Sequence, residues 1–199
     1  MLKLSNELRD EIHAIAVEHG WHETKQPSSH WLCLVISELM EAVEADRKGI
    51  KSQIVRFNKD MDYLIHEFKL YGERYNKAFM DEFSRYIKDT VEDELADAVI
   101  RLLDFAGETG TDIDLMANLL EHNERYVATA DTRFTGFIFA LCGILTNDER
   151  NIDWVIRNSL QRIDYICRSL GIDLNPFIRL KIEYNRLRPY KHGGKELFI

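Results

Sequence analysis

Proline, glycine and cysteine are scarce in this chain of 199 residues, which contains 3 Pro, 10 Gly and 3 Cys. Sheet sandwiches and barrels need turn residues at short intervals, so the scarcity of proline and glycine argues against a strand-rich fold. The cysteines, Cys33, Cys142 and Cys167, are odd in number, lie far apart in apolar sequence and form no C-x-x-C pair. We therefore expect buried, reduced thiols and no disulfide framework.

An excess of positive charge and long hydrophobic runs are also missing. The chain has 26 Lys and Arg against 34 Asp and Glu, which gives a formal net charge of −8. This balance argues against a duplex-DNA-binding protein, because such proteins neutralise many phosphates with basic side chains. The apolar run 31–36 is far too short to span a membrane, and residues 1–10 are too polar for a secretory signal. These absences predict a cytoplasmic protein without a membrane partner.

The spacing of apolar residues is helical nearly throughout the chain. It predicts a single all-α domain over 1–199, because no stretch has the composition of a linker. The expected helices span about 4–19, 30–48, 90–107, 113–127, 132–146, 152–170 and 176–188. The aromatic-rich segment 50–89 predicts one or two more helices, with a break near Gly72.

Short polar side chains stand where several of these helices begin. We expect Ser28 and Ser29 to cap the helix at 30–48. Thr90 is in position to cap the next long helix, with Asp93 as its reciprocal partner. Asn175, followed by proline, is expected to cap the last helix.

Three acids form one stripe on an otherwise apolar helix. In the helix expected at 30–48, Glu38, Glu41 and Glu44 follow one another at intervals of three, and most other positions are apolar on every face. Such a helix is typical of the interior of a bundle. Neighbouring buried carboxylates are costly, and a hard divalent cation with oxygen ligands compensates for them. We therefore interpret the stripe as part of a metal site.

A second acid pair, Glu94 and Asp97, stands on one face of the helix at 90–107, and Arg101 and Asp104 continue that face. Taken alone, such a stripe is typical of a solvated surface. Combined with the acids of the buried helix, it indicates two facing helices that enclose Mg²⁺, with Mn²⁺ as an alternative ion.

The helix expected at 152–170 weakly echoes the helix at 90–107. R-L-L-D-F and G-T-D-I-D-L in the first region become R-I-D-Y and G-I-D-L in the second. In the echo, Trp154 and Arg157 stand where the first helix has its acid pair. One hypothesis is a degenerate second half that has lost its acids, and chance similarity between amphipathic helices is the alternative.

The C-terminal stretch 181–195 is basic and ends in a glycine-rich tail. In a net acidic chain, such a stretch supplies positive charge and backbone N–H groups to phosphates. It is equally compatible with an ordinary C-terminal helix whose basic side chains interact with the helix dipole.

Three motifs in this order resemble the MazG-like nucleoside triphosphate pyrophosphohydrolases, a superfamily that includes the dimeric dUTPases and the dCTP pyrophosphatases. They are E-x-x-E at Glu38 and Glu41, E-x-x-D at Glu94 and Asp97, and K-x-x-x-N-x-x-R at Lys181, Asn185 and Arg188. The best-matched stretches are about 30–49, 88–107 and 172–195.

The resemblance implies an oligomeric helical bundle, a homodimer or larger, that hydrolyses a nucleoside triphosphate to the monophosphate and pyrophosphate with Mg²⁺. The metal ligands that it implies are Glu38, Glu41, Glu94 and Asp97. The phosphate contacts that it implies lie in the segment 176–195 and are Lys181, Asn185 and Arg188, with Tyr190 and Lys191 as further candidates. For the proton of the attacking water, the candidate bases are Glu41 and Glu44. Trp31 and His30 either border the base or serve as packing and capping residues.

The sequence departs from the family in ways that leave its substrate and assembly open. Ser37 stands where the MazG form often has a further acid, and the aromatic-rich segment 50–89 that separates the two acid pairs is unusually long. The segment 128–170 has no counterpart in the shortest members of the family. Two other functions compete with hydrolysis. A di-iron protein needs Glu-x-x-His pairs, which none of the seven histidines supplies, so we expect surface or capping histidines. The other is a non-catalytic nucleotide-binding or scaffold bundle.

Overall fold

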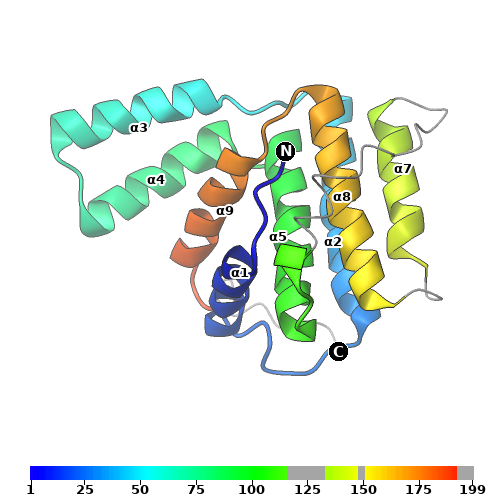
Figure 1. Cartoon of the computed structure of the whole chain (residues 1–199). Coiled ribbons are helices and arrows are strands. Elements are labelled where there is room, and N and C mark those ends of the chain that lie inside the picture. The colour runs from blue at the N-terminus through cyan, green and yellow to red at the C-terminus, as the bar shows by residue number, and fades with distance from the viewer. Residues whose placement is uncertain (116–132, 148–150, 192–199) are drawn as a thin grey trace.

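The computed structural model describes residues 1–115, 133–147 and 151–191, and these residues are built from α-helices (Figure 1). The all-α fold that the periodicity predicts is therefore confirmed. The helices with described bounds are α1 (Asn6–Glu18), α2 (Ser28–Lys48), α3 (Ile54–Phe68), α4 (Gly72–Tyr86), α5 (Val91–Thr109), α7 (Phe134–Leu145), α8 (Ile152–Leu170) and α9 (Asn175–Leu187).

Helix α5 lies at the centre of the bundle, where it contacts α1, α2, α8 and α9. In Figure 1, α1 and α9 stand on one side of α5, and α2, α8 and α7 stand on the other. Most of the 19 residues of α5 are buried, including Asp93, Glu94 and Asp104. Because other helices surround most of α5, these three acidic side chains point toward other helices, whereas Glu108 near its end is exposed.

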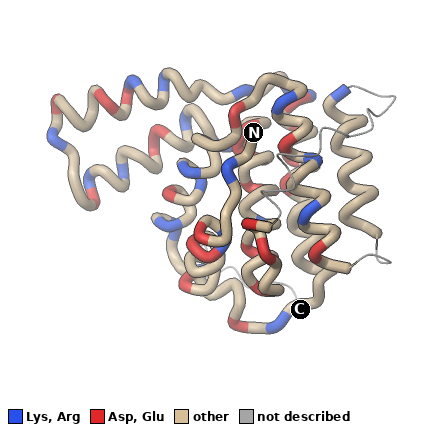
Figure 2. Tube along the Cα trace, viewed as in Figure 1, with Lys and Arg blue, Asp and Glu red and all other residues tan. Residues whose placement is uncertain are grey.

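Helices α3 and α4 form an arm that projects from the bundle (Figure 1), and the predicted break near Gly72 is confirmed. The arm carries charges of both signs, whereas α7 has none along its length (Figure 2). Aromatic contacts join the arm to α9. The rings of Phe57 and Phe79 meet edge-on with their centroids 5.7 Å apart, and stacked pairs follow at 6.0 Å for Phe79 and Phe83 and at 4.4 Å for Phe83 and Tyr184. The aromatic-rich segment therefore supports α9 from the side opposite α1.

The start of α5 matches its predicted cap in part. Thr90 Oγ1 accepts a hydrogen bond from the backbone N–H of Asp93 at 3.2 Å, as expected. The reciprocal bond was expected at the N–H of Thr90, but Asp93 Oδ2 accepts from the N–H of Asp89 at 3.1 Å. That partner lies one residue earlier, because Asp89 has a positive φ of 60° that turns its N–H toward the helix.

Two other predicted caps are wrong. Helix α2 begins at Ser28 with Pro27 at the N-cap, so Ser28 and Ser29 lie inside its first turn and no side chain caps it. The ring of Pro27 holds φ at −69°, which suits the extended N-cap conformation. Asn175 is the first residue of α9 and not its cap. Its Oδ1 accepts the N–H of Lys3 at 2.8 Å, so the side chain fastens the N-terminal segment instead.

The prediction that α2 is buried on every face is wrong, and so is the prediction of a buried Cys33. Cys33 is exposed and Met40 is 44% exposed, because α5 and α7 cover only part of the helix. The other two cysteines are half-buried (Cys142) and buried (Cys167). Burial raises the pKa of the Cys167 thiol to about 12, which keeps it protonated.

Helices α5 and α8, which the weak sequence echo relates, both run for 19 residues. Each begins after a capping side chain, and each ends at a glycine in the left-handed region, Gly110 and Gly171. These shared boundaries are compatible with a repeat, which stays a hypothesis.

Parts of two sequence predictions lie outside the described residues. These parts are the helix expected at 113–127 beyond residue 115, and the phosphate-binding segment beyond residue 191. Among the helices that the structure describes, none combines the length and apolar character needed to cross a membrane.

Candidate active site

Three of the four predicted metal-binding acids meet between α2 and α5. One carboxylate oxygen from each of Glu38, Glu41 and Glu94 lies within 4.8 Å of the others. The two helices pack along each other, and the three-residue spacing on α2 places two acids on the face that meets α5. Glu38 and Glu94 are buried, whereas Glu41 is exposed, so this acid cluster opens to solvent on the side of Glu41.

Burial and like charges make the acid cluster electrostatically unfavourable in the absence of a cation. Burial raises the pKa of Glu38 to about 7, and the charge on Asp97 adds to the effect while Arg101 opposes it. Burial also raises the pKa of Glu94 to about 8, with a further contribution from Asp93. A divalent cation relieves the same repulsion, and a donor set made only of carboxylate oxygens fits hard ions such as Mg²⁺.

Asp97, the fourth predicted metal ligand, binds a lysine instead of joining the acid cluster. Its Oδ2 lies 2.8 Å from Lys181 Nζ, which also lies 2.9 Å from Asp93 Oδ1. The lysine is only 4% exposed, and its Nζ is 5.7 Å from the ring centroids of both Phe83 and Tyr184. Burial lowers the pKa of Lys181, but the two aspartates outweigh it and raise that pKa. Lys181, predicted to contact phosphates, thus holds the acids of α5.

Sequence reasoning assigned Asp93 to helix capping and missed this ion pair. Asp93 and Asp97 are four residues apart, so they share a face of α5, and this spacing was visible in the sequence. The lysine that joins them lies 88 residues from Asp93 along the chain, and no local pattern connects the two.

A pocket opens between α1, α5 and α9, next to the acid cluster. Its polar wall is formed by Asp97, Arg101, Asp104, Asn185 and Arg188, and its other lining residues are Ile12, Ile15, Ala16, His19, Trp21, Ile100 and Ile182. Arg101 donates from Nε to Glu38 Oε1 at 3.2 Å and so connects the pocket to the acid cluster. Arg188, by contrast, has no carboxylate partner in the described part of the chain. Two of the three predicted phosphate contacts therefore line one pocket.

Glu44 and Trp31 lie outside both the acid cluster and the pocket. Glu44 is at the surface, where its carboxylate lies 3.2 Å from both Arg47 and Lys48. Trp31 is 4% exposed, and its ring stacks on that of His22 at 4.6 Å. Its neighbour in the sequence, His30, packs edge-on against the Trp31 ring, so both residues have packing contacts in this structure.

Tyr190 and Lys191, the further phosphate candidates, fasten the segment after α9 to the loop after α1. Both side chains bind the carboxylate of Glu23, and the Lys191 N–H donates to the carbonyl of His19 at 3.2 Å. The Tyr190 ring lies against Gly20, where a Cβ atom would be 2.6 Å from the ring. Glycine suits this position chiefly because the backbone adopts a positive φ of 81°, which strains other residues.

No family model, curated protein or solved structure matches the chain. The resemblance to the MazG-like enzymes therefore stays a prediction, and the functional argument depends on the geometry of the site.

Proposed function

We propose that this protein hydrolyses a nucleoside triphosphate to the nucleoside monophosphate and pyrophosphate, with Mg²⁺ as cofactor. The observation that carries the proposal is the meeting of Glu38, Glu41 and Glu94 beside a pocket whose wall includes Arg188. Triphosphate hydrolysis requires positioning and charge neutralisation of the phosphates, and these two features supply the ligands for a cation and a fixed positive group.

The roles of the side chains follow from their positions. Glu38, Glu41 and Glu94 hold the cation, and bound Mg²⁺ supplies the positive charge that stabilises the phosphate oxygens in the transition state. Arg188 and Asn185 face the same pocket, where the guanidinium and the amide N–H groups donate to phosphate oxygens. Apolar side chains of α1, α5 and α9 line the rest of the pocket and pack against the nucleoside.

Glu41 is the group that we assign to accept the proton of the attacking water. It is exposed to solvent at the mouth of the acid cluster, and its Oε1 lies 3.4 Å from the hydroxyl of Ser37. Glu44, the other candidate base, is one turn away and pairs with Arg47 and Lys48. These two glutamates therefore form a matched pair, one inside the acid cluster and one outside it.

Pyrophosphate release from a panel of NTPs and dNTPs with Mg²⁺ tests the proposal. We expect Glu38→Gln, Glu41→Gln and Glu94→Gln each to lower the rate by roughly 10²–10⁴-fold, and Glu44→Gln to leave it unchanged. Circular dichroism confirms that each variant keeps its helices. Absence of release from every nucleotide, or equal losses in Glu41→Gln and Glu44→Gln, would contradict the proposal.

One observation favours the alternative, a bundle that binds nucleotide without hydrolysing it. Lys181 already neutralises Asp97, which removes one of the four metal ligands that the MazG resemblance implies. Equilibrium binding of a nonhydrolysable nucleotide with Mg²⁺ separates the two functions. Binding that Arg188→Met abolishes, in a protein that releases no pyrophosphate, would establish the alternative.

We also infer a homodimer or larger homo-oligomer, as the resemblance implies. Met40 on α2 and Phe139 on the uncharged α7 are 44% and 82% exposed, but single exposed apolar side chains are normal on a protein surface. The inference therefore depends on the resemblance. Sedimentation equilibrium tests the inference, and a monomer at all concentrations would contradict it.

A further inference from the structure

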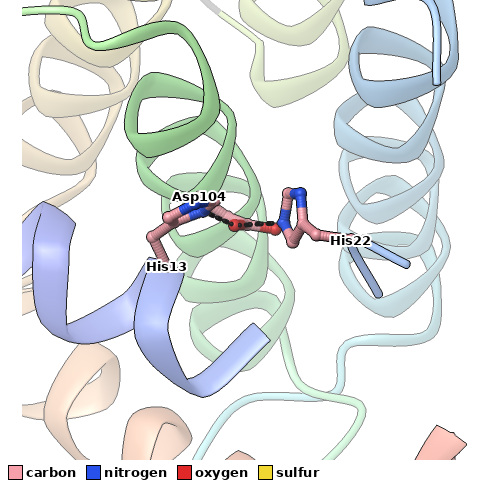
Figure 3. A group of neighbouring side chains, drawn as sticks. All are labelled: His13, His22 and Asp104. Carbon is pink, nitrogen blue, oxygen red and sulfur yellow. Dashed lines mark hydrogen bonds and ion pairs between the residues drawn. The ribbon is translucent and has the colours of Figure 1, made fainter. Parts of the chain in front are cut away.

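Three side chains of types that can ligate a metal, His13, His22 and Asp104, meet at a point farther along α5 than the acid cluster. Figure 3 shows the two histidines on either side of the aspartate. His13 comes from α1 and His22 from the turn that follows it. Asp104 Oδ1 lies 2.8 Å from His13 Nδ1 and 2.8 Å from His22 Nε2. Two imidazole nitrogens and one carboxylate oxygen therefore converge on one point, although sequence reasoning expected surface or capping histidines.

These groups are shielded from water to different degrees. The side chains of Asp104 and His22 are 6% and 8% exposed, and that of His13 is 24% exposed. Burial raises the pKa of Asp104, but the hydrogen bonds from the two histidines outweigh it and lower that pKa. The carboxylate is thus ionised at neutral pH and can act as a ligand.

The ring of His22 is fixed by contacts on its other side. Its Nδ1 lies 3.2 Å from Glu108 Oε2, and the ring stacks on Trp31 with the centroids 4.6 Å apart. A carboxylate on the distal nitrogen of a ligating histidine is a recurring feature of metal sites, because it fixes the tautomer and the orientation of the ring. Here the contact leaves Nε2 directed at Asp104.

The backbone of α5 is also adapted to this cluster. Gly107 lies against His13, and a Cβ atom at Gly107 would be 2.6 Å from both Cβ and Cγ of the histidine. Any larger residue would force α1 away from α5 at this point. Glycine is costly within a helix, so its presence here is explained by the close approach that brings His13 to Asp104.

We propose that His13, His22 and Asp104 bind a first-row transition-metal dication such as Zn²⁺, at a site separate from the acid cluster. Imidazole is a preferred ligand of these ions, whereas Mg²⁺ prefers oxygen ligands alone. Tetrahedral donors at about 2.0–2.1 Å from Zn²⁺ are roughly 3.3 Å from one another. The two nitrogen–oxygen distances, now 2.8 Å, need to lengthen by only roughly 0.5 Å to match this spacing, and the three ligand atoms already lie within 4.8 Å of one another.

The site leaves a fourth position for water, and it joins α1 and the following turn to α5. Asp104 also lines the pocket between α1, α5 and α9, so the ion lies at the wall of that pocket. The proposal does not depend on nucleotide hydrolysis, because it concerns different ligands and a different class of ion.

Cobalt titration of the full chain tests the site. The protein is stripped with a chelator and titrated with Co²⁺ in excess Mg²⁺, which occupies oxygen-only sites. Four-coordinate Co²⁺ with imidazole ligands absorbs strongly in the visible, and we expect one such ion per chain, displaced by Zn²⁺. His13→Ala and His22→Ala should lower the affinity by roughly 100-fold or more, whereas Glu38→Gln and His66→Ala, which removes an exposed histidine on α3, should not.

The variant Gly107→Ala distinguishes a metal site from a cluster that is only hydrogen-bonded, and it does so without removing any ligand. Displacement of His13 should lower the Co²⁺ affinity by roughly 10–100-fold in a protein that stays helical. Because His13 is the most exposed of the three side chains, His13→Ala decides the question if His22→Ala fails to fold. A wild-type protein without the visible band, or equal bands in His13→Ala and His66→Ala, would overturn the proposal and leave only a hydrogen-bonded network.

Discussion

Glu94 and Asp104 lie on the same helix and are equally buried, each 4% exposed, yet their pKa values move in opposite directions. Burial raises the pKa of Glu94 to about 8, and the neighbouring carboxylates of Asp93 and Asp97 add to the effect. Burial also acts to raise the pKa of Asp104, but two histidines donate hydrogen bonds to it and lower that pKa. Hence the partners, and not the depth of burial, decide the protonation of an acid on α5.

The opposite pKa shifts of Glu94 and Asp104 distinguish two kinds of site on α5. At Glu94 the like charges are in excess, and the folded chain needs a proton or a cation there. At Asp104 the charge of the carboxylate is already balanced by hydrogen bonds from the two histidines. An ion bound there would replace the protons of those hydrogen bonds, and there is no repulsion between carboxylates for it to relieve. The following predictions test this contrast, beginning with the largest expected effect.

Lys181→Met should produce the largest loss of stability. Nζ of Lys181 is the shared partner of Asp93 and Asp97, and its removal leaves both carboxylates buried beside Glu94. Breaking a buried pair in this way costs about 3–5 kcal/mol, which urea unfolding measures directly. Arg188→Met is the matched control, because Arg188 has no carboxylate partner in the described residues. A similar loss in both variants would show that the lysine has no special role.

Amide substitutions at the two equally buried acids should have effects of opposite sign. Asp104→Asn keeps the shape but removes the charged acceptor of two histidines, so we expect a loss of about 2–3 kcal/mol. Glu94→Gln removes one of several like charges, so without Mg²⁺ at about pH 8 it should stabilise the chain. Urea unfolding of both variants in chelator measures the difference. Equal losses would show that burial, and not the partners, controls these acids.

The sequence predicted the acid cluster but not the second site, and the reason is the range of the contacts. Glu38 and Glu41 share a face through local helical spacing, and hydrophobic periodicity placed their helix in the bundle. His13 and His22 reach Asp104 across 91 and 82 residues, and a pattern on one element cannot show such a meeting. Gly107, where the sequence predicted the helix to end, lies inside α5, and a glycine in a helix interior is the one local signal of a close approach here.

The helices themselves were predictable because periodicity extends over many residues, as the observed bounds of α5 and α8 confirm. The ends of the helices were less predictable, because a distant hydrogen-bond partner can take the side chain that would otherwise cap the helix. Asn175 is a residue type that often caps helices, but its side-chain oxygen accepts the backbone N–H of Lys3 and not an N–H of α9. Cys33 was misplaced for a related reason: an apolar position on α2 is buried only if another helix covers it.

The acid cluster should make the stability of the metal-free protein fall as the pH rises. Glu38 has a pKa of about 7 in the folded chain and an ordinary value of 4.5, so between these values the folded chain holds a proton that the unfolded chain has released. Rising pH therefore favours unfolding, by on the order of 2 kcal/mol between about pH 5 and about pH 8 from Glu38 alone, and Glu94, with a pKa of about 8, adds to this loss. Urea unfolding in chelator at both pH values measures the loss.

Two comparisons assign this pH dependence to the acid cluster. Glu38→Gln should reduce the pH dependence without abolishing it, because Glu94, with a pKa of about 8, loses its proton over the same range. The variant should be more stable than the wild type at about pH 8. Excess Mg²⁺ should stabilise the wild type more at the higher pH, because the ion replaces the released protons. An unchanged slope in the variant would place the titrating group elsewhere.

Glu44→Gln should have the smallest effect on stability, and it tests whether the acid cluster ends at Glu41. Glu44 continues the stripe of Glu38 and Glu41 in sequence, but its carboxylate is at the surface with Arg47 and Lys48. Exposed pairs of this kind contribute little, so the free energy of unfolding should change by less than about 0.5 kcal/mol. The stabilisation by Mg²⁺ should also match that of the wild type. If the variant loses the Mg²⁺ effect, the ion lies one turn farther along α2, and Glu44 is a ligand in spite of its surface partners.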